Sequence, residues 1–137
     1  MRQAKGRVAQ WIFDGPALKV ERAYSHVKSL VERLLAYRRS DFCFPFVDQE
    51  IKEGRSGLSV QLKPLPPATP LIIGDAVHNL RSALDHLIVN IVMSAGNKPS
   101  NYLVFPFAQP REELVRSGRM KEIHETVPDV YDIILKI

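Results

Sequence analysis

The segment from Pro70 to Ala95 reads PLIIGDAVHNLRSALDHLIVNIVMSA, and it decides the fold of this chain. At about 100° per residue its large apolar side chains gather on one side of a helix, while polar and charged side chains occupy the opposite arc. The apolar side consists of Ile73, Val77, Leu80, Leu84, Leu87, Ile88 and Ile91. Thr69 is a capping residue at its start, and Gly96 is a typical helix stop. The pattern predicts one long amphipathic helix from Pro70 to Ala95.

A second amphipathic pattern runs from Ala17 to Arg39. We expect this helix to begin at Asp14-Gly15-Pro16, because aspartate can cap a helix and proline suits its first turn. Residues 1–13 are basic and are interpreted either as an arm or as a segment whose last part packs on the body of the protein. Two long amphipathic helices bury their apolar sides most simply against each other, so an antiparallel pair is expected. The residues expected in its core are Leu30, Val31, Leu34, Leu80, Leu84 and Ile88.

Residues 42–63, between the two helices, follow a different pattern. Pro45 disfavours a helix, and Leu58–Leu62 alternates apolar with polar side chains, as a strand does. The sequence therefore predicts an inserted β-hairpin that pairs Cys43–Ile51 with Leu58–Leu62, with its turn near Gly54–Gly57. Residues 64–70 hold four prolines and are interpreted as an extended linker.

The C-terminal part predicts smaller elements. Tyr102–Phe107 is expected to form a short strand or an extended strap, and short helices are expected over Pro110–Ser117 and from Pro128 to Ile137. The predicted fold is mostly α within an α+β class: a helical bundle of two long antiparallel helices with an inserted β-hairpin and short C-terminal helices. At 137 residues the chain is expected to form a single domain over 1–137.

Composition narrows the class of protein. One cysteine excludes an internal disulfide and a cysteine-based zinc cluster. No apolar stretch reaches the roughly 18 residues that a membrane span needs, and no apolar region follows the basic N-terminus as in a signal peptide. We therefore expect a soluble, cytoplasmic protein with no membrane partner. The net charge of +4 weakly favours anionic partners such as nucleic acid.

The polar arc of the helix over Pro70–Ala95 carries the candidate site. Arg81 and Asp85 are four residues apart, so they can pair along the helix surface. A solvated helix face explains such a composition without any chemistry. The concentration of titratable side chains nevertheless marks this arc as the candidate site. Its members are Asp75, His78, Asn79, Arg81, Ser82, Asp85 and His86.

Two resemblances bear on this arc. The stretch GDAVHNLRSALDH at 74–86 resembles the signature of a group of bacterial and phage proteins to which no activity is assigned. Within it, Arg81-Ser-Ala-Leu-Asp-His86 has the R-x4-H spacing and so resembles HEPN domains. HEPN domains are helical bundles that include metal-independent ribonucleases of toxin and phage-defence systems.

The HEPN resemblance implies roles for particular residues. Arg81 would hold the scissile phosphate, and His86 would assist proton transfer at the 2′-hydroxyl or the leaving oxygen. Around them, His78, Asn79 and Asp85 would complete the binding surface. Ser82 would belong to it too, although the family usually has Asn, Asp or His at that position. The resemblance also implies a homodimer, because the family's site usually lies between two protomers, and it implies cleavage or binding of RNA without metal or cofactor.

Two alternatives stay open. The chain can be a non-catalytic helical interaction module of phage or mobile-element origin. It can also be a metal-dependent helical-bundle enzyme, since Asp75 and His78 have the i, i+3 spacing of carboxylate–histidine metal sites, with His26 or Glu32 as further ligands. No second motif of this kind occurs, so the leading interpretation has no metal site.

Overall fold

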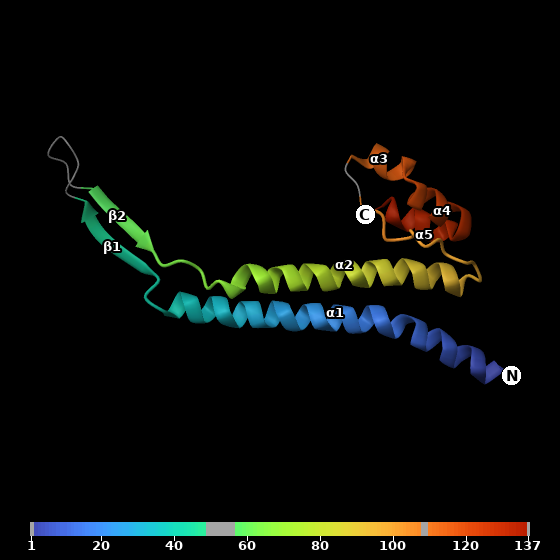
Figure 1. Ribbon diagram of the computed structural model, residues 1–137, viewed down its shortest axis with the longest axis horizontal. Coiled ribbons are helices and arrows are strands. Elements are labelled where there is room, and N and C mark those ends of the chain that lie inside the picture. Colours follow the sequence, from blue (N-terminus) through green and yellow to red (C-terminus); the bar gives the residue numbers. More distant parts are fainter. Residues whose placement is uncertain (1, 49–56, 108–109, 137) are drawn as a thin grey trace. The chain divides into compact units, whose positions relative to one another are not determined.

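The computed structural model describes residues 2–48, 57–107 and 110–136, and it confirms the predicted fold class. Two long helices pack together, a two-stranded antiparallel hairpin lies between them in sequence, and short helices follow (Figure 1). The elements are α1 (Arg2–Arg39), β1 (Cys43–Asp48), β2 (Gly57–Leu62), α2 (Ala68–Ser94), α3 (Arg111–Arg116), α4 (Gly118–Thr126) and α5 (Pro128–Ile134). Among the described residues, no helix is long and apolar enough to cross a membrane.

The chain is grouped into two compact units. Unit 1 combines Met1–Ala23 with Val77–Ile137, and unit 2 is the intervening stretch Tyr24–Ala76. Each unit contains a segment of α1 and a segment of α2. The C-terminal helices belong to unit 1 and the β-hairpin belongs to unit 2.

Unit 1 contains the hydrophobic core. Ile88 and Val92 project from α2 into a cluster formed with Leu103 and with residues of α4 and α5. The cluster consists of Ile88, Val92, Leu103, Met120, Ile123, Val127 and Ile134. The sequence analysis missed α4, although its signals are present: the Ser117 side chain accepts a hydrogen bond from the Met120 amide at 3.2 Å, as an N-cap does. The strap at 103–107 is irregular rather than a strand.

The predicted start of the first helix was wrong. α1 runs from Arg2 through Pro16, which is buried, so residues 2–13 are helical rather than a separate arm. A proline inside a helix leaves the carbonyl four residues before it without a donor, here that of Ile12. The side-chain amide of Asn90 on α2 donates to this Ile12 carbonyl. A long-range hydrogen bond thus replaces the one that Pro16 cannot make, and the helix continues.

The ends of α2 differ in how well they follow the prediction. The helix begins at Ala68, two residues early, so Thr69 lies in its first turn and is not a cap. The Thr69 amide donates to the Pro66 carbonyl at 2.9 Å, which starts the helix directly after the prolines. Gly96 ends it as predicted, with φ of 85°. The amides of Gly96 and Asn97 bond to the Met93 and Val92 carbonyls, the pattern of a Schellman cap.

The β-hairpin of unit 2 is confirmed over its described part. Cys43–Asp48 pairs antiparallel with Gly57–Leu62, in a register that sets Cys43 opposite Leu62 and Val47 opposite Leu58. The predicted strand residues 49–51 and most of the predicted turn lie outside the described residues. The sheet has two strands among the residues that the structure describes.

The predicted core between the two long helices is only partly right. Ile88 is buried, and Leu30 and Leu84 are half-buried. Val31, Leu34 and Leu80 are instead 49%, 37% and 45% exposed. Ala23 on α1 and Ala76 and Ala83 on α2 are also buried. Small side chains of the two long helices are therefore buried where several of the larger predicted core residues are exposed.

Candidate functional site

Arg81 and Asp85 lie one turn apart on α2, in unit 1, as the sequence predicts. The guanidinium Nε of Arg81 is 3.4 Å from a carboxylate oxygen of Asp85, and the two side chains are 40% and 26% exposed. An ion pair with this much solvent contact contributes little to stability by itself, on the order of a few tenths of a kcal/mol. Its importance therefore depends on what else the two side chains contact.

Both side chains hold the strap that passes over α2. Asp85 accepts a hydrogen bond from the Phe105 amide at 2.9 Å, and Arg81 donates to the Phe105 carbonyl at 3.1 Å. The guanidinium carbon also lies 4.0 Å from the centre of the Phe107 ring, within the range of a cation–π contact. We name these four residues, Arg81, Asp85, Phe105 and Phe107, the Arg81 clamp.

The Arg81 clamp has a clear structural purpose. The strap has no strand partner, so its backbone groups need side chains to satisfy them. Asp85 and Arg81 satisfy the amide and the carbonyl of Phe105, which fixes the strap next to the buried Leu103. The hydrogen-bonding capacity of Arg81 that a phosphate would use is thus partly committed within the chain.

His86 lies apart from Arg81. His86 is five positions after Arg81, so its side chain lies about 140° further around α2. His86 is exposed and lies beside α1, where a methyl group built onto Gly15 would be 3.8 Å from its Nδ1 atom. Within one chain the structure therefore brings Arg81 together with Asp85 but not with His86.

The other predicted binding residues occupy the polar arc of α2 in unit 1. His78 is exposed, and Asn79 and Ser82 are half-buried. In the part of the chain that the structure describes, no group of three or more His, Cys, Asp or Glu side chains is arranged to hold a metal ion.

The sequence analysis missed a different feature, the exposure of apolar residues in unit 2. Tyr24, Val27, Val31, Leu34 and Leu35 fall within about 100° of one another around α1. They are exposed by 69%, 41%, 49%, 37% and 44%. We name these five residues the helix strip. Their periodicity was visible in the sequence, but it was interpreted as the face that packs on α2.

The hairpin of unit 2 carries a second exposed apolar surface. Directly paired residues of two strands share a face of the sheet. One face is formed by the pairs Cys43–Leu62, Pro45–Val60 and Val47–Leu58, all apolar and all exposed. We name these six residues the hairpin face. Comparison with protein-family models, with curated proteins and with solved structures finds no match for this chain.

Proposed function

We propose that this chain is a non-catalytic helical interaction module that assembles as a homodimer through unit 2. The observation that carries the proposal is the missing core of that unit. Among its described residues the buried ones are Thr69 and Ala76, whereas most of its large apolar side chains are exposed. A unit of this size needs a hydrophobic core or a partner to be stable.

The amount of exposed apolar surface suits a second copy. The helix strip and the hairpin face together leave on the order of 1,000 Å² of apolar side chain uncovered, against the roughly 800 Å² that each partner contributes to a standard interface. Monomeric proteins rarely expose continuous apolar patches above a few hundred Å². An isolated two-stranded hairpin is also only marginally stable in water, so the hairpin face gains most from being covered.

Unit 1 has an apolar groove of its own, of about 480 Å³. Phe13, Pro16 and Val20 of α1 line it on one side, and Leu80 and Leu84 of α2 line it on the other. A pair of helices with an apolar groove resembles one half of a four-helix bundle. In such a bundle, the side chains of a second pair of helices fill the groove.

The test is self-association and its loss in matched variants. Sedimentation velocity should give a dimer for the natural chain at micromolar concentrations. Val31→Glu should raise the dimer dissociation constant about 100-fold or more, because a carboxylate would be buried in the interface. Leu18→Glu is the control: Leu18 is 63% exposed on α1 but lies about 120° from Tyr24, away from the helix strip. Its dissociation constant should not change.

A natural chain that stays monomeric at about 100 μM would contradict the proposal, since an interface of this area should hold at that concentration. Equal weakening by Val31→Glu and Leu18→Glu would contradict it as well, because the helix strip would then have no special part. Circular dichroism of both variants checks that the helices persist, as expected for substitutions at exposed positions.

RNA cleavage is the second candidate function, and the exposure of His86 supports it. Because His86 lies about 140° around α2 from Arg81, both side chains can flank one phosphate only if a second copy supplies one of them. We expect no cleavage of RNA in the presence of a metal chelator, since Arg81 already binds Phe105. Metal-free cleavage that His86→Ala reduces about 100-fold and His78→Ala leaves intact would favour this candidate instead.

A further inference from the structure

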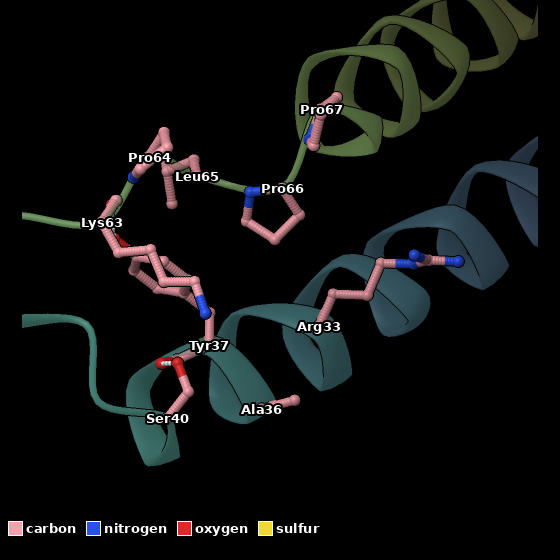
Figure 2. Close-up of a pocket in the computed structure, with 9 residues that line it drawn as sticks. All are labelled: Arg33, Ala36, Tyr37, Ser40, Lys63, Pro64, Leu65, Pro66 and Pro67. Carbon is pink, nitrogen blue, oxygen red and sulfur yellow. Dashed lines mark hydrogen bonds between the residues drawn. The ribbon is translucent and has the colours of Figure 1, made fainter.

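Unit 2 also forms an open pocket of about 530 Å³ between the end of α1 and the proline-rich linker. Arg33, Ala36 and Tyr37 line it from one face of α1, and Ser40 lines it directly after the end of that helix. The segment Lys63–Pro67 forms the opposite wall (Figure 2). Its volume lies in the range of small-molecule sites, and no function has been assigned to it above.

The walls of the pocket are fixed in place. The Tyr37 hydroxyl donates to the Lys63 carbonyl, and the Lys63 amide donates to the Phe42 carbonyl at 2.8 Å. The Ser40 hydroxyl donates to the Tyr37 carbonyl at 2.7 Å. The prolines within Lys63–Pro67 have fixed φ angles, which further restricts the linker. A pocket with walls held in this way loses little conformational entropy when it binds a ligand.

The chemistry of the lining selects a class of ligand. The lining is largely apolar, with Ala36 on α1 and the prolines of the linker on opposite sides of the pocket (Figure 2). Among the residues that the structure describes, the charged ones that line it are Arg33 and Lys63, both cations, and no carboxylate does. Arg38 and Arg39 in the last turn of α1 offset the partial negative charge of the helix end. The described lining therefore combines apolar side chains with two positive charges.

From this combination we infer that the pocket binds a small aromatic carboxylate. The aromatic ring packs between the proline rings and Ala36, and the carboxylate pairs with the Arg33 guanidinium, whose planar fork matches it. Lys63 adds a second positive charge from the linker. The pocket is centred about 160° around α1 from the helix strip, so it stays open when the helix strip is covered. The inference thus does not depend on the proposed dimer.

The test uses 2-naphthoate and its neutral analogue 2-naphthamide as probes, with binding followed by amide chemical shifts in NMR spectra of the full chain. Naphthoate should shift the amides of Ser40, Lys63 and Leu65 in a saturable way. Naphthamide should bind about tenfold or more weakly, because it lacks the charge that pairs with Arg33.

Matched variants locate the charge effect. Arg33→Gln and Lys63→Gln should each weaken naphthoate binding several-fold without changing naphthamide binding. Arg38→Gln removes the same charge from the same helix outside the pocket lining and should leave both affinities unchanged. Equal affinity for the two probes, shifts confined to the helix strip, or no saturable shift would each overturn the inference.

Discussion

Ile88→Ala should lower the free energy of unfolding of this chain by about 2–5 kcal/mol, the largest effect expected from removing a single apolar side chain. Ile88 is 1% exposed and packs in a cluster with Val92, Met120 and Ile123, which are fully buried as well. The substitution removes three carbon atoms from the centre of that cluster, and the surrounding helices can close the resulting cavity only in part. Urea unfolding followed by circular dichroism measures the change.

Ile73→Ala provides the matched control for Ile88→Ala. It makes the same chemical change on the same helix, but Ile73 is 45% exposed. At concentrations low enough to avoid association, it should lower the free energy of unfolding by less than about 1 kcal/mol. Similar losses from both substitutions would show that the core is not where the structure places it.

Asn90→Ala should cost about 1–3 kcal/mol, because it leaves the Ile12 carbonyl without a donor. The same carbonyl lacks its normal helical donor because residue 16 is proline, and the Asn90 side chain replaces that donor. Pro16→Ala supplies a backbone N–H at that position. In the Asn90→Ala background, Pro16→Ala should therefore recover part of the lost stability.

A double-mutant cycle isolates the coupling between Pro16 and Asn90. Its four proteins are the natural chain, the two single variants and the double variant. We expect a coupling free energy of about 1 kcal/mol or more, since the two substitutions act on one carbonyl. Additive effects would contradict the explanation of how α1 passes through Pro16. Because packing losses from each substitution cancel in the cycle, the result reports on the shared hydrogen bond alone.

Local signals in the sequence were enough to predict the two long helices and the hairpin. The apolar periodicity over 70–95, the alternation of Leu58–Leu62 and the stop at Gly96 each depend on neighbours in sequence. The predicted start of α1 was wrong because proline usually lies in the first turn of a helix. Here the Asn90 side chain supplies the donor that Pro16 lacks, so the helix continues through the proline. That partner lies 78 residues away and leaves no local trace.

The candidate site was harder to predict for a related reason. The spacing of Arg81 and Asp85 is the same for a surface ion pair, a phosphate site and a clamp. Which of these it forms depends on the strap, since Phe105 presents its amide and carbonyl to these side chains. Periodicity likewise identifies the helix strip as apolar, yet it cannot tell whether the other helix of the same chain covers it.

The division of unit 1 into two stretches of sequence has a consequence for synthesis on the ribosome. Ile12 is made 78 residues before Asn90, its hydrogen-bonding partner. At typical elongation rates, the first part of α1 is synthesised roughly 4–16 s before its partner Asn90. Unit 2 is continuous in sequence, so its helix pair and hairpin can close during that wait. The nascent chain therefore displays the helix strip before its hydrophobic core exists, and neighbouring nascent chains on one messenger are the first copies that it can meet.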